Sequence, residues 1–211
     1  MSDESQSQTK RDRRRRQILG ATMRLVSRYG TGISTAQIAA AASCSKETLY
    51  NWFDDRDGLF LALIEEQARS MGAALDRAVA ALGDEGDTDF ETRLTHHAIA
   101  LLDIMTGDAV IVVNRVAMSQ CCVENQATGS AVLTAWDEQI RSRFEALIGE
   151  AAQAGLVAKF DPALQFDGLV GLLIGDRQRR ILLGAAARPK GDAMRKIARE
   201  AVRNWLLLNK P

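Results

Sequence analysis

Residues 31–67 read TGISTAQIAAAASCSKETLYNWFDDRDGLFLALIEEQ, and this stretch decides the fold prediction. The spacing Ser34-x-x-Gln37 is that of a capping box, in which two side chains satisfy free amides at the start of a helix, and it predicts an alanine-rich helix. A short break follows, and Ser45 is a typical N-cap for a third helix over 46–52. Two short helices separated by such a break have the proportions of a helix-turn-helix.

Outward from this stretch the sequence predicts an all-α protein of nine helices. Only three prolines interrupt the chain, and alanine and leucine, which favour helices, are abundant. The segment 109–119 is rich in valine, but no partner strand is apparent near it, so we expect a buried helix. Asp161-Pro162 and the capping-box spacing Thr88-x-x-Glu91 mark two further helix starts. The helices expected outside the opening stretch are 11–29, 56–82, 88–105, 109–119, 128–154, 161–183 and 192–208.

The distribution of charge divides the chain into parts. The 211 residues include 27 basic and 27 acidic side chains. Up to Arg56, 10 basic residues accompany six acidic ones, a net charge of +4, whereas the remainder has 17 basic and 21 acidic residues, a net charge of −4. Such asymmetry is typical of a nucleic-acid-binding module joined to an acidic one. We expect a disordered polar tail over 1–10, a helix-turn-helix DNA-binding domain over 11–56 and a second domain over 57–211.

The short third helix has the side chains that DNA recognition requires. Helical periodicity directs Leu49 and Phe53 to the core. The polar or amphipathic side chains left for DNA are Lys46, Thr48, Tyr50, Asn51 and Trp52. In a helix-turn-helix the second helix of the motif enters the major groove. The sequence therefore predicts that 46–52 is the recognition helix.

The motif TLYxxF at 48–53, followed by a basic residue and an apolar helix, resembles the N-terminal domain of TetR-family transcriptional regulators. The resemblance is strong over 12–66, and residues 161–184 resemble one group of the family's C-terminal domains. Ser43-Cys44-Ser45 stands where the family has a Gly-Val-Ser-like turn, and Arg56 stands where lysine is common. The resemblance implies an N-terminal three-helix DNA-binding domain and a C-terminal helical bundle for ligand binding and dimerisation.

The resemblance also implies DNA contacts for matched positions. Hydroxyl and positively charged groups hold phosphates, whereas amines, amides and carboxylates can read base edges. The expected phosphate contacts are Thr35, Thr48, Tyr50 and Arg56, and the candidates for base contacts are Lys46, Glu47, Asn51 and Trp52. The recognition helix is short and offers few contacts, so we expect a homodimer on a palindromic double-stranded DNA operator.

The basic run KRDRRRR at 10–16 precedes the first helix. One interpretation is an arm whose Arg13 and Arg14 reach flanking phosphates or a minor groove, where clustered arginines are favoured. The other is a solvated helix start that only aids solubility. The position of the run beside a helix-turn-helix favours the first interpretation.

The second domain has no catalytic signature, because the sequence contains no phosphate-binding loop, GxSxG or HExxH motif. We therefore expect a regulator that is not an enzyme and needs no cofactor, and whose bundle binds a small lipophilic ligand that releases the operator. The residues expected around a central pocket are His97, Met105, Val112, Met118, Trp136 and Phe144, with His96 and Cys121 as further candidates. The alternative for each of them is ordinary core packing.

The last two predicted helices are expected to form the dimer interface, a four-helix bundle about a two-fold axis. Small residues allow close helix approach, and leucines add apolar area. The expected interface residues are Gly168, Gly171, Leu172, Gly175, Leu182 and Leu206. The alternative is a stripe that packs within one chain.

Cysteine and histidine usage points away from disulfides and metals. The three cysteines, Cys44, Cys121 and Cys122, form no disulfide framework, and adjacent His96 and His97 lack metal-ligand spacing. The vicinal pair could sense oxidants if its thiolates were exposed and activated, but a buried pair of small apolar side chains is the favoured interpretation. The N-terminus lacks a secretory signal and the chain lacks apolar runs of about 20 residues, so we expect a cytoplasmic protein without membrane contact.

Two other classes of function remain open. A helical enzyme or small-molecule carrier with an incidental helix-turn-helix would need paired carboxylates, histidines or a cofactor motif in the second domain, and none is visible. An activator or membrane-associated adaptor would keep the fold, but beyond the arm the sequence has no basic amphipathic helix for a membrane surface.

Overall fold

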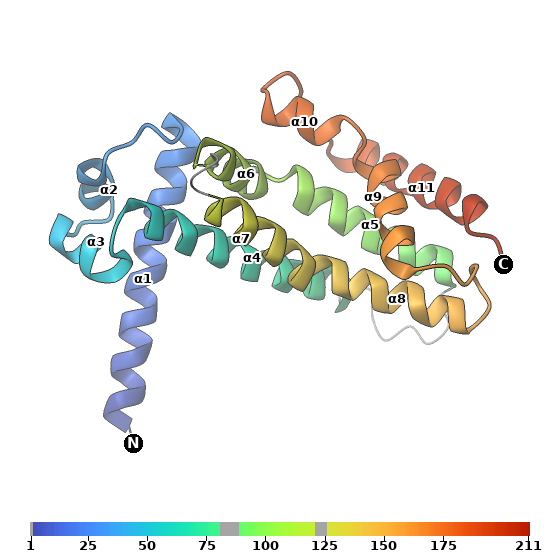
Figure 1. The fold of residues 1–211 in the computed structure, drawn as a ribbon, viewed down its shortest axis with the longest axis horizontal. Helices are drawn as coiled ribbons and strands as arrows, with labels where there is room; N and C mark the ends of the chain where they lie inside the picture. Colours follow the sequence, from blue (N-terminus) through green and yellow to red (C-terminus); the bar gives the residue numbers. More distant parts are fainter. Residues whose placement is uncertain (1, 81–88, 121–125) are drawn as a thin grey trace. The chain divides into compact units, whose positions relative to one another are not determined.

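The computed structural model describes residues 2–80, 89–120 and 126–211, and every regular element in these ranges is helical (Figure 1). The all-α prediction is therefore confirmed. The chain divides into two compact units, which are described separately below. The first contains the described parts of Met1–Gln67 and Val112–Val132, and the second those of Ala68–Ile111 and Leu133–Pro211.

The first unit is built on the helix-turn-helix. Helix α1 (Ser2–Tyr29) packs against α2 (Thr35–Ala41), and α2 packs against α3 (Lys46–Phe53) (Figure 1). The start of α4 (Arg56–Ala80) and most of α6 (Asp108–Gln120) complete the unit, together with the first turns of α7 (Ala127–Trp136). Its core consists of buried aliphatic and phenyl side chains, among them Ile18, Ile38, Leu49, Phe53, Phe60 and Val116.

The second unit is a bundle around aromatic side chains. Its C-terminal helix α11 (Gly191–Leu208) packs against α5 (Phe90–Thr106) and α9 (Pro162–Ile174), and α9 packs against α8 (Ser142–Gln153). A π-helical turn, Asp137–Arg141, joins α7 to α8, and the short α10 (Arg177–Leu182) follows α9. The largest buried side chains are Phe144, Phe166 and Trp205.

Local sequence signals account for several helix starts. Ser34 and Gln37 form the predicted capping box, with Ser34 Oγ accepting from the Gln37 amide at 3.2 Å and Gln37 Oε1 accepting from the Ser34 amide at 2.8 Å. Asp161 caps α9, and Pro162 occupies its first turn. The valine-rich segment forms α6, because one face packs on the core of the first unit and the backbone amides are paired within the helix.

Three local predictions need correction. Helix α1 begins at Ser2 and not near Arg11, because neither glycine nor proline interrupts the polar residues that were expected to form a disordered tail. Asp89 caps α5, accepting from the Thr92 amide at 3.0 Å and from its hydroxyl at 2.7 Å; Thr88, the predicted cap, lies outside the described residues. The first compact unit extends to Gln67, beyond the boundary expected at Arg56, because the buried face of α4 continues through Leu63.

A fourth correction concerns the helix expected over 161–183. It is broken at Gly175, which has a φ of +50° and closes α9, and α10 starts only at Arg177. Left-handed backbone of this kind is accessible to glycine at little cost. The expected interface stripe of glycines therefore ends, as a helical stripe, at Gly171.

Candidate DNA-binding site

Helix α3 separates its side chains as DNA recognition requires. Leu49 and Phe53 are buried, as the periodicity predicts, whereas Lys46, Glu47 and Asn51 are exposed. Tyr50 exposes 45 % of its surface. Among the other predicted contacts, Thr35 and Trp52 are half-buried. One face of α3 therefore holds the helix on the core and the other presents polar groups.

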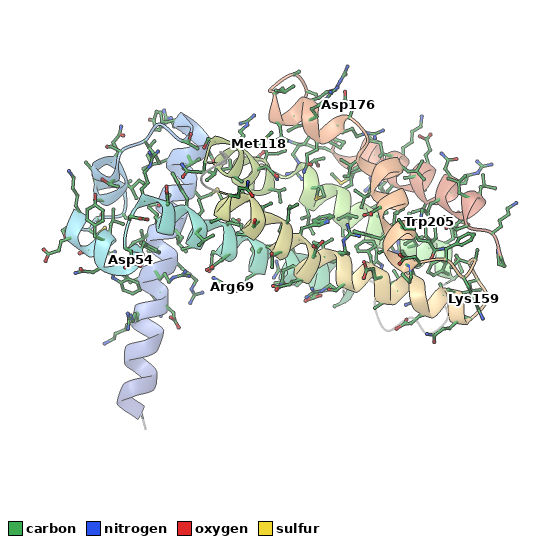
Figure 2. All side chains as sticks on the ribbon, in the orientation of Figure 1. Asp54, Arg69, Met118, Lys159, Asp176 and Trp205 are labelled. Carbon is green, nitrogen blue, oxygen red and sulfur yellow. The ribbon has the colours of Figure 1, made fainter. Side chains whose placement is uncertain are left out.

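The N-terminus of α3 is fixed by two side chains. Ser45 Oγ accepts from the Thr48 amide at 3.0 Å and lies 2.8 Å from the Thr48 hydroxyl. The helix ends at Asp54, whose amide donates to the Tyr50 carbonyl at 2.8 Å (Figure 2). Capping of this kind stabilises a helix by about 1 kcal/mol. The eight-residue helix α3 therefore has a start that its own side chains define.

The turn between α2 and α3 is a Schellman motif. The Ser43 amide donates to the Ala40 carbonyl at 3.1 Å and the Cys44 amide to the Ala39 carbonyl at 2.9 Å. The motif puts Ser43 in the left-handed region, with a φ of +51°. Glycine is the usual residue here, and a residue with a Cβ costs roughly 1–2 kcal/mol in this conformation. The turn of this protein is therefore strained at Ser43.

The arginines of the basic run at 10–16, which lies within α1, do not all point in one direction. Arg14 Nη2 donates to the Ser43 carbonyl at 2.7 Å, and the Arg11 guanidinium lies 5.3 Å from the centre of the Trp52 ring. Arg15 lies over Phe53 and 3.8 Å from the Glu65 carboxylate. Residues three and four apart share a helix face, so these three arginines face the protein.

Arg13 and Arg16 are exposed on the rest of the helix. Of the two arginines predicted to reach DNA, only Arg13 is directed to solvent, because Arg14 is engaged with the turn. The sequence alone shows that Arg11, Arg14 and Arg15 share one helix face, because they are spaced i, i+3, i+4. It does not show which surface of the protein that face contacts.

Arg56 is also turned inward. Its Nη2 atom donates to the Thr31 carbonyl, and its guanidinium lies 5.1 Å from the centre of the Phe60 ring. Its Nε atom is buried without a hydrogen-bond partner. Arg56 was expected to hold a phosphate, but it fastens the loop before α2 to the start of α4.

Two family models match the chain. The model of bacterial regulatory proteins of the tetR family matches residues 18–63, which contain the helix-turn-helix. The model of the C-terminal domain of AefR-like transcriptional repressors matches residues 92–208, more than half of the chain. The chain belongs to the TetR family. It is therefore a DNA-binding transcriptional regulator, and the all-α architecture with an N-terminal helix-turn-helix is that of the family.

Solved TetR-family structures share the fold. A TetR regulator from Agrobacterium tumefaciens is 28 % identical, with a TM-score of 0.69 over 92 % of this chain and 94 % of that one. A chain from Mesorhizobium loti assigned to the TetR family is 20 % identical, with a TM-score of 0.82 over 95 % of this chain and 98 % of that one. The flavonoid-responsive regulator FrrA is 21 % identical, with a TM-score of 0.70 over 95 % and 98 %. No curated protein matches the chain.

The predicted pocket residues of this TetR protein fall in different places. His97 packs edge-on against Phe144 with ring centres 5.8 Å apart, and Trp136 lies 5.9 Å from Phe166, which in turn lies 5.1 Å from Phe144. Met105 packs against the same core. His97, Trp136, Phe144 and Phe166 therefore form one aromatic cluster in the second unit.

Val112 and Met118 do not join that cluster. Val112 is buried in the core of the first unit, and Met118 projects from α6 with 69 % of its surface exposed (Figure 2). The buried face of α6 is taken by its valines, which leaves Met118 on the opposite side. Cys121 and Cys122 lie outside the described residues, so the idea that they sense oxidants stays a prediction.

Burial lowers the pKa of His97 below its usual value of 6.5. The hydrogen bond that the His97 ring nitrogen donates to the Arg93 carbonyl raises the pKa, and the charges of Arg93 and His96 lower it. A histidine with a lowered folded-state pKa is neutral above pH 6.5 in both the folded and unfolded states. Below that pH the unfolded chain binds the proton first, so stability is lost as the pH falls. We expect the melting temperature to drop between pH 7.5 and 5.5, and to drop less in His97→Gln.

Thermal melting followed by circular dichroism measures this difference. His96→Gln is the matched control, because it removes the neighbouring histidine and leaves His97 in the aromatic cluster. An equal pH dependence in wild type and His97→Gln would show that His97 does not couple folding to protonation.

Three of the six predicted interface residues border an apolar groove between α9 and the end of α11. The groove has a volume of about 570 Å³, and Gly168, Gly171 and Leu172 line it together with Leu164 and Leu208. Leu164 is 69 % exposed and Leu208 is 72 % exposed. Trp205 and Gln165 form its floor, where the indole Nε1 donates to the Gln165 carbonyl at 2.7 Å (Figure 2).

Leu206 and Leu182 are half-buried and Gly175 is exposed, and none of the three lines the groove. Phe160, Leu164 and Leu208 also line the groove and were missed. Helical periodicity does not separate an exposed leucine near a helix end from a buried one, and it does not apply to Phe160, which precedes α9.

Other kinds of site find no support in the described residues. No helix among them is long and apolar enough to cross a membrane. No group of three histidine, cysteine, aspartate or glutamate side chains in this part of the chain is arranged to hold a metal ion.

Proposed function

We propose that this TetR-family protein is a repressor that binds a palindromic operator as a homodimer and leaves it on binding a small lipophilic ligand. The observation that carries the proposal is the exposed polar face of the capped helix α3, with Lys46, Tyr50 and Asn51 directed away from the core. The match to the C-terminal domain of AefR-like repressors supports repression. Because it acts on chromosomal DNA, we place it in the cytoplasm.

Selection of bound DNA from a random pool tests the operator. An inverted repeat with two half-sites would support both the DNA-binding role and the two-fold symmetry of the protein. Recovery of a single short site without symmetry would contradict the dimer, and recovery of no sequence would contradict operator binding.

Tyr50→Ala tests the contribution of α3 to phosphate binding. The phenol is nearly half-exposed and has no part in the core, so we expect an unchanged melting temperature. Loss of a phosphate contact weakens binding to all sequences, and we expect about a tenfold loss of operator affinity, equivalent to about 1.4 kcal/mol. Fluorescence anisotropy with labelled operator and with unrelated DNA measures both losses. Wild-type affinity at physiological salt would rule the phosphate contact out.

The aromatic cluster supports the proposed ligand class. His97, Trp136 and Phe144 bring two apolar rings and one imidazole into the interior of the second unit, and surroundings of this kind suit a lipophilic molecule with few polar groups. FrrA, one of the similar structures, is named as flavonoid-responsive. Release of the DNA requires that the ligand bind the DNA-free conformation more tightly. Titration of the protein–operator complex with a panel of lipophilic compounds would identify those that lower operator affinity.

A further inference from the structure

We propose that Arg14 is a positioning residue, which holds Ser43 in its left-handed conformation and so sets the direction in which α3 leaves α2. The inference rests on the proposed operator binding, because α3 is taken as the recognition helix. In this proposal Arg14 stabilises the turn between α2 and α3 and does not contact the DNA backbone.

The turn has a feature that requires such a residue. Ser43 occupies the Schellman position at which glycine is usual, and its φ of +51° is unfavourable for serine. Arg14 comes from α1, 29 positions earlier in the chain, and its Nη2 atom donates to the Ser43 carbonyl at 2.7 Å. Its Nη1 atom donates to Gln17 Oε1 on the same helix at 3.2 Å. A hydrogen bond from a charged donor is stronger than one between neutral groups. The bond from Arg14 therefore favours the orientation of the Ser43 carbonyl that the left-handed conformation of Ser43 produces.

The loop at the other end of α2 is held in the same way. Arg56, from the start of α4, donates to the Thr31 carbonyl just before α2. Each loop that flanks α2 therefore accepts a hydrogen bond from an arginine of a long helix. Arg14 of α1 bonds the loop after α2, and Arg56 of α4 bonds the loop before it. Arg11 adds a third contact, because its guanidinium lies against Trp52 of α3 itself. Two of these three arginines, Arg14 and Arg56, were expected to contact DNA, whereas in the structure they contact the loops of the helix-turn-helix.

A double-mutant cycle tests the action of Arg14 on Ser43. Wild type, Arg14→Met, Ser43→Gly and the double variant are titrated with the selected operator at several salt concentrations. Glycine takes the left-handed conformation unaided, so it removes the need for Arg14. We expect Arg14→Met to lower operator affinity about tenfold in the wild-type background and less than about threefold in the Ser43→Gly background.

Salt dependence separates this mechanism from a phosphate contact. Each lost phosphate contact reduces the slope of log affinity against log salt by roughly 0.9, whereas a positioning residue leaves the slope unchanged. We therefore expect an unchanged slope for Arg14→Met and a weaker effect on unrelated DNA than on the operator. Arg13→Met is the matched control, because it removes the same charge from an exposed position next to Arg14. Its effect should be equal in the two Ser43 backgrounds.

Three results would overturn the proposal. They are equal losses from Arg14→Met in both Ser43 backgrounds, a reduced salt slope, and equal losses on operator and unrelated DNA. If wild type selects no operator, the proposed function fails. The melting temperatures of the same four proteins still test whether Arg14 stabilises the left-handed conformation of Ser43. Additive melting-temperature changes would then overturn it, and a smaller effect of Arg14→Met in the Ser43→Gly background would support it.

Discussion

A chain with the substitution Gly171→Lys is expected to be a folded monomer with operator affinity reduced by a factor on the order of 100 or more, because two linked half-site contacts become independent. Gly171 is exposed in α9 and lines the apolar groove, and a Cβ added there meets no atom within 4 Å in the same chain. Replacing glycine inside a helix also stabilises the helix by up to about 1 kcal/mol. The substitution therefore leaves the monomer intact and places a charge in the middle of the proposed interface.

Sedimentation velocity at micromolar concentration measures the change in mass, and anisotropy measures the operator affinity. Gly149→Lys in α8 is the matched control, because a Cβ there also meets nothing within 4 Å and the residue lies outside the groove. The control should remain a dimer. A dimeric Gly171→Lys protein with wild-type affinity would place the interface elsewhere.

The substitution Gly58→Ala is expected to destabilise the DNA-binding unit by about 2 kcal/mol. Alanine normally gains up to about 1 kcal/mol over glycine inside a helix. At Gly58, however, the added Cβ would overlap the carbonyl oxygen of Phe53 and lie 3.2 Å from its carbonyl carbon. Both are backbone atoms at the end of α3, so relief requires a shift of the turn between α3 and α4. Overpacking of this kind costs about 1–3 kcal/mol, which outweighs the helix gain.

Thermal melting and operator titration of the same protein check this result. Gly20→Ala in α1 is the control, because its Cβ meets only the Arg24 side chain at 3.6 Å. We expect the control to be as stable as wild type or more so. If Gly58→Ala instead raises the stability as the control does, the backbone between α3 and α4 can shift at little cost and the prediction is wrong.

The fold was predictable because its determinants are local. The capping box at Ser34, the Asp161-Pro162 start and the alternation of buried and exposed residues on α3 all follow from neighbours in the sequence. One of the errors arose where a single residue overrode a periodic pattern. Gly175 ends a helix that the apolar pattern would continue, and its left-handed φ is decided by the surrounding chain.

The candidate DNA contacts were only partly predictable. Residue type places Lys46, Tyr50 and Asn51 on an exposed helix face, and the structure agrees with that placement. Arg14 and Arg56 have the same chemistry as phosphate contacts, but their guanidinium groups meet backbone carbonyls of loops that are distant in sequence. No rule that considers charge and spacing alone separates an arginine that binds DNA from one that binds its own backbone.

The bond between Arg14 and the strained Ser43 constrains how the two positions can change during evolution. Loss of the arginine is harmful while serine occupies the turn, but becomes nearly neutral once glycine stands there. Evolution can therefore lose Arg14 without harm if Ser43 is first replaced by glycine. If Arg14 is lost first, the intermediate protein binds its operator more weakly. The combination of residues at positions 14 and 43, one in a helix and one in a turn, would therefore show in which order the two positions changed in related proteins.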